Sequence, residues 1–224
     1  IEQPAPQKTI IRTRARTVSE KAPAALEYEQ TLTIFGDGQV LLDNHIVAHH
    51  GLPPLPRIGL TLSLPAGFEH LTWFGRGPFE NYRDRNSGAL VGKYRSTVSE
   101  QYVPYILPQE HGNKTDVRWV ALTNDAGAGL LATGIPAMEM SAGHYTAHDL
   151  FAAAHTHEIT PRAETFLNLD LQQMGLGSAS CGPATLPPYI IAPGAYSFSV
   201  RLRPFTRDDP SPAQLARTAL PKEL

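Results

Sequence analysis

Residues 167–172 read LNLDLQ, so that leucine alternates with a polar residue along the whole stretch. The same period of two recurs in LTLSL at residues 60–64 and in YSFSVRL at residues 196–202. Successive side chains of a β-strand point to opposite faces, so each stretch predicts a strand with one face in a core. Residues 32–42 read LTIFGDGQVLL, in which a glycine-rich turn separates two apolar runs, and this pattern predicts a β-hairpin.

Turn-forming residues are spread along the remainder of the 224-residue chain, with 18 glycines and 20 prolines, and they suit many short strands. We therefore expect an all-β fold, a large antiparallel sandwich. We divide the chain into a flexible lead-in segment (residues 1–8), a sandwich domain (residues 9–205) and a C-terminal tail (residues 206–224).

Helical signals are confined to two short segments. Thr146 can cap a helix that runs through residues 149–154, with Asp149 in the reciprocal capping position. In the tail, residues 211–217 (SPAQLAR) combine a serine cap, a proline in the first turn and good helix formers.

Composition and charge exclude several classes of function. Lys and Arg number 19 and Asp and Glu 21, with a formal net charge of -2, and the basic residues are scattered except for Arg12, Arg14 and Arg16. We interpret that triplet as the solvated face of a strand, and we expect no nucleic-acid partner. No stretch approaches the roughly 18 apolar residues of a membrane span, so no membrane partner is expected either.

The ends and the single cysteine bear on the origin of the chain. It begins with Ile1 and shows no signal peptide, so we expect a piece of a longer polypeptide, with a cytoplasmic location favoured. One cysteine excludes an internal disulfide framework and a cysteine-rich zinc site.

The densest cluster of chemically active residues is WFGRGPFENYRDR, residues 73–85. Aromatic side chains such as Trp73 can stack on a sugar ring, while Glu80 and Arg83 can bond its hydroxyl groups. The alternative is a structural loop, in which Glu80 and Asp84 pair with Arg83 or Arg85 and hold the segment together.

Glu110 and His111 form a candidate acid–base pair. Adjacent residues on a strand point to opposite faces, so a shared site would require a loop or bulge there.

Four histidines, His144, His148, His155 and His157, lie close together in the sequence, with Asp149 and Glu158 nearby. On a strand, residues 155–157 would place two imidazoles on one face, as in half of a zinc site. No further ligand is evident from the sequence, so we predict no metal site and no cofactor for the chain.

The spacing of the acidic residues in the sequence does not identify any pair as the two carboxylates of a glycosidase. In retaining enzymes those carboxylates lie about 5–5.5 Å apart. A phosphate-binding loop, a Ser-His-Asp signature and a CxxC motif are also absent. From these patterns alone we predict a β-sandwich with a possible carbohydrate-facing surface.

A series of motifs over residues 9–205 closely resembles the last domain of family 2 β-galactosidases, often called the small chain. Their order along the chain matches as well as their content. They are residues 56–60 (PRIGL), 73–85 (WFGRGPFENYRDR), 102–110 (YVPYILPQE), 112–113 (GN), 144–146 (HYT), 169–170 (LD), 173–177 (QMGLG) and 201–204 (RLRP).

The resemblance implies a galactose mutarotase-like supersandwich that packs against a (β/α)8 TIM barrel. It places the catalytic glutamates and the magnesium site of a retaining β-galactosidase in that barrel. The chain is then a non-catalytic module, inactive by itself, that contributes to the active-site rim, carbohydrate binding and assembly. The parent enzyme is expected to be a homo-oligomer that binds magnesium, sodium and a galactoside substrate.

The family also implies particular contributions from this module. Its relatives carry a sugar-stacking Trp on the loop after the Met-Gly-Leu-Gly motif, and Cys181 is the best match to that position here. A thiol has no flat face for stacking, so the platform is either weaker here or supplied by another residue. The alternative is that Cys181 is simply a small buried residue. The family's sodium site uses backbone carbonyls at the position of Leu107 and Pro108. We take as rim candidates Cys181, Ser180, Glu80, Arg83, His111 and Trp73.

Two other functions remain open at this stage. A free-standing epimerase of the mutarotase type would need a base and an acid facing one sugar, and Glu110, His144 and His155 are the suggestive set. A carbohydrate-binding or purely structural module would bind sugar or a partner domain without turnover.

Overall fold

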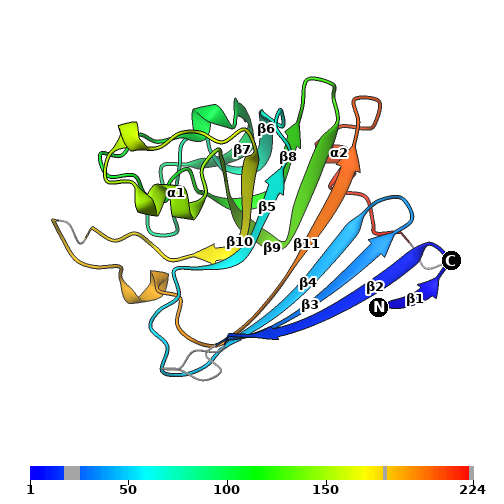
Figure 1. The fold of residues 1–224 in the computed structure, drawn as a ribbon, viewed down its shortest axis with the longest axis horizontal. Coiled ribbons are helices and arrows are strands. Elements are labelled where there is room, and N and C mark those ends of the chain that lie inside the picture. Colours follow the sequence, from blue (N-terminus) through cyan, green and yellow to red (C-terminus); the bar gives the residue numbers. More distant parts are fainter. Residues whose placement is uncertain (18–25, 179–180, 222–224) are drawn as a thin grey trace.

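A computed structural model describes residues 1–17, 26–178 and 181–221. The chain is built almost entirely from β-strands (Figure 1). They are β1 (Glu2–Ala5), β2 (Lys8–Arg16), β3 (Leu26–Phe35), β4 (Val40–Ala48), β5 (Arg57–Leu64), β6 (His70–Gly77), β7 (Leu90–Thr97), β8 (Lys114–Thr123), β9 (Gly129–Gly143), β10 (Thr165–Gln173) and β11 (Ala195–Phe205). The short helices are η1 (Ser99–Gln101), α1 (Ala147–Ala152), η2 (Thr156–Glu158), η3 (Pro187–Tyr189) and α2 (Pro212–Leu215). The predicted all-β class is confirmed.

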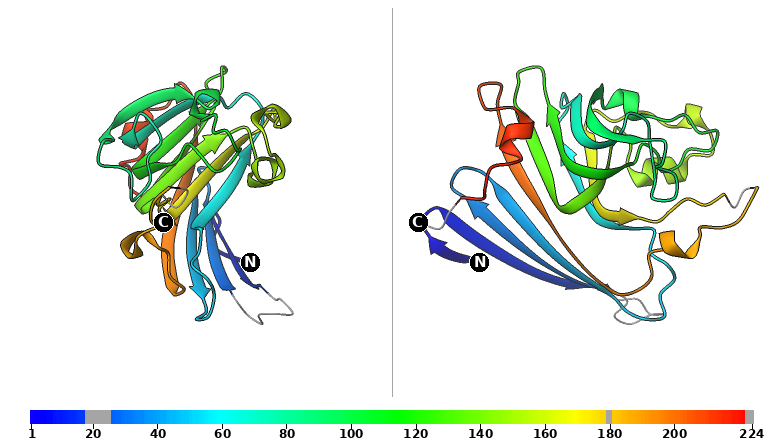
Figure 2. Two further views of the ribbon diagram at one scale, coloured as in Figure 1. Left: turned by 90° about the vertical axis from the view of Figure 1, so that its left-hand side faces the viewer. Right: turned by 180° about the vertical axis from the view of Figure 1, so that it is seen from behind.

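All the strands belong to one antiparallel sheet with the order β1-β2-β3-β4-β11-β9-β8-β6-β7, and β10 and β5 branch from it at β9. In Figure 1 the arm of β1 to β4 curves away to the lower right, while β5 to β10 gather around α1 on the other side. Figure 2 shows the same division from the side and from behind. The expected sandwich is therefore one continuous sheet that branches.

The branch depends on the length of β9, which has three neighbours. Along one edge, residues 129–135 pair with β11 and residues 139–143 pair with β10. Along the other edge, β8 pairs on both sides of a bulge, because residues 134–137 lie opposite Arg118 alone. Pro136 has no N–H to donate, and a Cβ at Gly134 would lie 2.8 Å from the Pro136 carbonyl oxygen. These two residues therefore suit the point where the partner strand changes.

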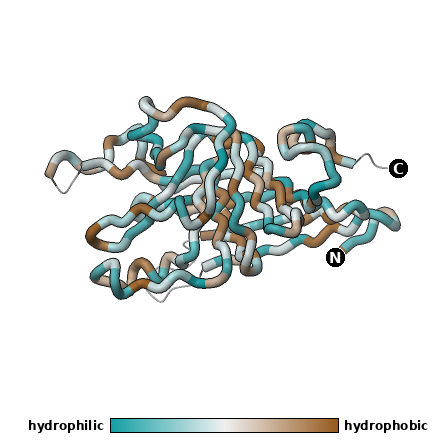
Figure 3. Tube along the Cα trace, turned by 90° about the horizontal axis from the view of Figure 1, so that it is seen from above, coloured by the Kyte–Doolittle hydropathy of each residue, from teal (hydrophilic) through white to brown (hydrophobic). Residues whose placement is uncertain are grey.

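The main hydrophobic core draws its buried strand residues from β5, β6, β8, β9, β10 and β11, and Ile46 of β4 packs against it. Ile58, Leu169 and Val200 all belong to it, although they come from β5, β10 and β11. In Figure 3 the apolar colouring is concentrated along the central strands. The leucines of the three alternating stretches thus face inward or pack against the core, as the period of two predicted.

The local signals of the sequence are confirmed at the hairpin and at both helices. Gly38 adopts a φ of 83° at the end of the turn between β3 and β4, a conformation that favours glycine. Thr146 and Asp149 form a capping box at α1, and Ser211 caps α2 in the same way. Neither helix, nor any other among the described residues, has the length and apolar character needed to cross a bilayer.

Both ends of the described chain are joined to the sheet domain. At the N-terminus, β1 pairs with β2, so the residues before Lys8 extend the sheet. Leu215 of α2 is buried beside Trp119 and Phe205, and Arg201 of β11 donates to the Thr218 carbonyl oxygen at 2.5 Å. The N-terminal strand is thus held by its neighbour in the chain, whereas the tail is held by residues of β8 and β11 that lie further away in the sequence.

The junction of β10 with the core gives a test of the fold. Leu169 is fully buried, so Leu169→Ala is expected to lower the free energy of unfolding by about 2–5 kcal/mol, through lost apolar burial and the cavity left behind. Leu90→Ala on the exposed edge strand β7 is the matched control, with a change within about 0.5 kcal/mol. Urea denaturation followed by circular dichroism measures both, and equal effects would contradict the assigned core.

Candidate functional site

A concave pocket of about 370 Å³ lies over the polar face of the branch strands, where β5, β9 and β10 run side by side. The loop that carries Glu110 and His111 closes one side, and the start of α1 closes another. The lining residues are Arg57, Thr61, Ser63, Glu110, His111, Ser141, Ala142, Gly143, Tyr145, Thr146, Ala147, Leu150, Phe166 and Asn168.

Arg57 is the charged centre of this pocket. Its guanidinium donates to Glu110 at 3.1 Å and to the buried carboxylate of Asp170. Gly59 makes room for this pair, since a Cβ there would lie 1.9 Å from Asp170 Oδ1. Burial raises the pKa of Asp170 to about 6, and the charge of Arg57 opposes that shift. Arg57 therefore links Glu110, at the wall of the pocket, to the buried Asp170.

The floor of the pocket is a chain of hydrogen bonds across three strands. Thr61 donates to Asn168 at 2.8 Å, and Asn168 donates to Ser141 at 2.9 Å. Phe166 adds an aromatic surface from the same strand as Asn168. Ordered hydroxyl and amide groups beside a ring are the features with which proteins bind sugars.

The loop that carries Glu110 and His111 is held by aromatic contacts. His111 lies edge-on to Tyr102 at 5.1 Å between ring centroids, and Tyr102 in turn packs against Tyr145 at 5.3 Å. His111 Nδ1 contacts the Gln109 carbonyl oxygen at 2.8 Å, so Nδ1 acts as the donor and Nε2 remains an acceptor. Glu110 is bound to Arg57, so the adjacent pair predicted from the sequence is not an acid–base couple.

Glu80 holds loops together, as the structural alternative predicted. Its carboxylate accepts from Arg85 at 2.9 Å, from the Gly112 backbone at 2.9 Å and from the Tyr105 hydroxyl. The neighbouring Asn81 is fully buried and accepts from both the backbone and the hydroxyl of Thr115. The motif around Glu80 is thus fixed to the start of β8.

Arg83 lines a second, more polar pocket of about 310 Å³, together with Glu139 of β9 and Tyr189 of η3. Arg83 donates to Gln172 at 2.6 Å, and the neighbouring Asp84 accepts from the Gly177 backbone at 2.8 Å. The Asp84 contact ties the loop that follows the Met-Gly-Leu-Gly motif to the loop of Arg83.

Glu139, in that pocket, is almost completely buried. Burial raises its pKa to about 7, although hydrogen bonds from Asn113 and the Gln173 backbone and the charge of Arg83 work in the opposite direction. Asn113 donates to Glu139 at 2.8 Å and also to the Asn81 carbonyl oxygen.

The prediction that Trp73 lies on a substrate rim is wrong. Trp73 is 1% exposed, packs against Tyr94 and donates to the Arg76 carbonyl oxygen at 2.9 Å. The buried ammonium of Lys114 lies 5.4 Å from its ring centre, and burial lowers the pKa of Lys114 to about 8. Alternation along β6 turns this indole inward, so no face is left for a sugar.

The remaining candidates lie in different places. Cys181 is exposed on its loop, with its backbone N–H bonded to the Ser178 carbonyl oxygen at 2.9 Å, and is not the small buried residue of the alternative reading. Ser180 lies outside the described residues. The epimerase set is divided, because Glu110 lines the concave pocket, His144 bonds Glu69 at 2.8 Å and His155 lies at η2.

Sequence reasoning missed the residues that organise the concave pocket. Arg57 and Asp170 stand in two of the quoted motifs, yet they are separated by 113 positions and no pattern in the sequence pairs them. Asn168 is only one polar residue of the LNLDLQ alternation, and Ser141 and Phe166 lie outside the motifs of the sequence analysis. The available signal was the polar half of the LTLSL and LNLDLQ alternation, which now forms the pocket floor.

The model of the family described as "Beta galactosidase small chain" matches residues 2–202. The chain belongs to the β-galactosidase small chain family. This confirms the resemblance drawn from the motifs. A β-galactosidase of Priestia megaterium is 38% identical over 176 residues, one of Vibrio cholerae 37% over 180 residues, and one of an Arthrobacter species 33% over 199 residues.

The aligned segments make up most of this chain but only a small part of each relative. The aligned segments cover 78%, 80% and 86% of this small chain domain, but only 17%, 17% and 20% of the three relatives. The chain therefore spans about a fifth or less of these curated relatives. In each of these relatives, the matching segment is one part of a longer β-galactosidase.

Among solved structures, the chain is similar to galactose 1-epimerase from Lactobacillus acidophilus, with a TM-score of 0.43 and 7% identity over 90% of this chain and 64% of that one. It is also similar to a GalM/aldose epimerase homologue from C. elegans, with a TM-score of 0.44 and 12% identity over 92% and 67%. At these identities the likeness concerns the fold alone.

Among the described residues, one group of histidine and acidic side chains is compact enough to hold a metal ion. It consists of His155, His157 and Glu158. Magnesium prefers an octahedral shell of oxygen atoms, which two imidazoles and one carboxylate do not provide. At the expected sodium position, the Leu107 carbonyl oxygen accepts from the Gln109 side chain at 3.3 Å. We assign no step to either ion.

Glu139 makes the stability of the domain depend on pH. Its pKa rises from 4.5 to about 7 on folding, so the folded state holds this proton more tightly and stability falls between about pH 4.5 and 7. Glu139→Gln is expected to remove that fall and to be more stable than the wild type at pH 8, by roughly 1–3 kcal/mol. Urea unfolding at pH 5, 6, 7 and 8 measures it. Glu164→Gln, at an exposed position, is the control, and parallel curves for Glu139→Gln and the wild type would contradict the assignment.

Proposed function

We propose that the chain is a non-catalytic module of a retaining β-galactosidase and that it works by docking on the remainder of the enzyme. The observation that supports this most directly is an exposed apolar groove of about 420 Å³ between the loop of residues 107–110 and α1. Leu107 is 58% exposed and Phe151 is 90% exposed at this groove, and the adjacent Ile106 is 92% exposed.

Apolar side chains gathered in this way usually mark an interface, because leaving them in water has a free-energy cost. The relatives supply an occupant, since more than four fifths of their length lies outside the part that matches this chain. The docked partner is then the rest of the β-galactosidase polypeptide, which we expect to include the TIM barrel. Contacts at this groove would also serve the assembly of the enzyme.

The state of the carboxylates supports a non-catalytic role. A retaining glycosidase needs one carboxylate as nucleophile and a second, protonated one as acid, on either side of the scissile bond. In the concave pocket, Glu110 and Asp170 both bind Arg57, and Asp170 is only 2% exposed. Neither is available to protonate a leaving group while also facing a sugar ring.

Docking can be tested in a chimera in which this chain replaces the matching segment of the Priestia megaterium enzyme. The purified chain alone is expected not to hydrolyse o-nitrophenyl β-galactoside, while the chimera does. Leu107→Asp and Phe151→Asp are expected to lower the chimera's activity at least about tenfold, because each places a charge in a desolvated contact.

Leu90→Asp in the chimera is the matched control, since Leu90 is 72% exposed but lies on β7, away from the groove. The three variants of the isolated chain should keep wild-type thermal unfolding, which separates lost docking from lost folding. Turnover by the isolated chain would contradict the non-catalytic role. Full activity in both groove variants would contradict docking.

The concave pocket favours a second candidate function, the binding of a galactoside without turnover. Its polar floor of Thr61, Asn168 and Ser141 is preformed, and Phe166 and Tyr145 supply rings against which the C–H face of a sugar can pack. Arg57 and Glu110 offer charged hydrogen-bonding groups at the wall. This pocket would present sugar beside the docking groove, with which it shares Glu110, Ala147 and Leu150.

Lactose binding to the purified chain, measured by saturation-transfer NMR, tests this pocket. Phe166→Ala is expected to weaken binding by roughly two- to tenfold, since ring contacts contribute on the order of 0.5–1.5 kcal/mol beyond the area they bury. Phe79→Ala removes an exposed aromatic ring outside the pocket and should leave binding unchanged. Absence of saturable transfer at high lactose would leave docking as the sole proposed role.

A further inference from the structure

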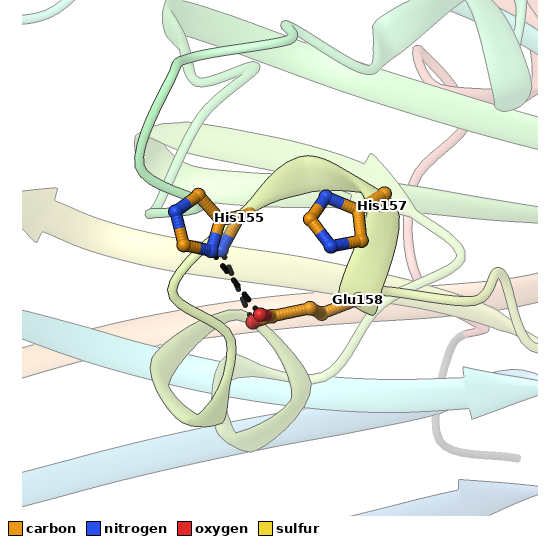
Figure 4. Close-up of side chains that lie close together, drawn as sticks. All are labelled: His155, His157 and Glu158. Carbon is orange, nitrogen blue, oxygen red and sulfur yellow. Dashed lines mark hydrogen bonds and ion pairs between the residues drawn. The ribbon is translucent and has the colours of Figure 1, made fainter.

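A compact group of three ligand side chains lies after α1, away from both pockets described above. It consists of His155, His157 and Glu158, all exposed, with one nitrogen or oxygen atom of each within 4.8 Å of the others. Figure 4 shows both imidazoles and the carboxylate on the same side of the η2 turn.

The turn itself brings these side chains together. The sequence analysis expected residues 155–157 on a strand, which is wrong, because they form the start of the 3-10 helix η2. His155 is the N-cap of η2 and Glu158 is its third residue, so the Glu158 carboxylate folds back onto His155 as in a capping box. His157 then stacks on His155 with ring centres 5.4 Å apart and an interplanar angle of 23°.

The carboxylate is fixed by backbone contacts that leave part of it available. Glu158 Oε2 accepts the N–H groups of Ala154 at 2.7 Å and His155 at 3.1 Å. Glu158 Oε1 contacts Nδ1 of His155 at 3.1 Å. These bonds hold the Glu158 carboxylate beside the imidazole of His155.

The donor types define the class of ion that fits. Two imidazole nitrogens with one carboxylate oxygen form a ligand set that zinc uses, and nickel, cobalt and copper also accept imidazole. We propose that His155, His157 and Glu158 form a surface site for a divalent transition-metal ion of the zinc class. Bond lengths of about 2.0–2.2 Å require the ligand atoms to approach more closely than 4.8 Å, which exposed side chains can reach by rotation. Water completes the coordination, because all three ligands are open to solvent.

The assignment goes beyond docking and sugar binding, because the ligands belong to neither the groove nor the concave pocket. A bound ion would connect both histidines to the helical turn and so stabilise the connection between α1 and β10. Such a site is expected to bind in the micromolar range, because it has three protein ligands and no enclosing shell.

Isothermal titration of the untagged, EDTA-treated full chain with zinc chloride tests the proposal. One equivalent is expected to bind, with a rise in the thermal unfolding midpoint. His157→Ala removes one ligand without touching the cap, since the hydrogen bonds that fix the turn are made by Glu158 and His155. It should weaken binding about tenfold or more and abolish the thermal shift.

His148→Ala is the matched control, because His148 is an exposed neighbour outside the group of three. It should bind zinc as the wild type does. Glu158→Gln keeps an oxygen for the backbone contacts but loses the charge, and it should also weaken binding. No saturable binding by the wild type, or wild-type affinity in His157→Ala, would overturn the proposal.

Discussion

The hydrogen-bonding capacity of strand β9 is the constraint on which the rest of the structure depends. A strand has two edges, and β9 uses one for β8 and divides the other between β11 and β10. The bulge at residues 134–137 falls where the partner changes, and residues 135–137 are exposed, so backbone groups left without a β8 partner can reach water. The branch strands β5 and β10 are held in place by this division.

The same branch explains why charged groups are buried in a β-sheet domain. The polar faces of β5, β9 and β10 meet beneath long loops, so Asp170 and Glu139 are covered without reaching solvent. Arg57 neutralises the first, while Asn113 and the field of Arg83 only partly stabilise the second. The motifs shared with the family thus hold loops to the sheet, as Glu80 and Asn81 do, more than they present catalytic groups.

The surface carries two neighbouring hollows, the concave pocket and the apolar groove, that differ in chemistry. The concave pocket has a polar floor preorganised by hydrogen bonds, and the neighbouring groove at Leu107 and Phe151 is apolar and exposed. A module built to complete a larger enzyme would be expected to combine such surfaces, one for a hydroxyl-rich ligand and one for a partner polypeptide. The histidine turn at η2 is a third feature, built by local geometry and independent of both.

Much of the architecture was determined by the sequence itself. Period-two alternation identified the strands at residues 60–64, 167–172 and 196–202, and the motifs identified the family. Local capping at Thr146 and the Gly38 turn were also predictable, because each depends on residues within a few positions.

Tertiary structure decided which partners distant parts of the chain would meet. Alternation says that Trp73 faces one side of its strand, but only the packed sheet shows that this side is the core. Arg57 and Asp170 lie 113 positions apart and pair because β5 and β10 are neighbouring strands. No local sequence pattern predicts the order of strands in the sheet. Thus the sequence determined the strands and the family, whereas long-range pairing across β9 determined the pocket.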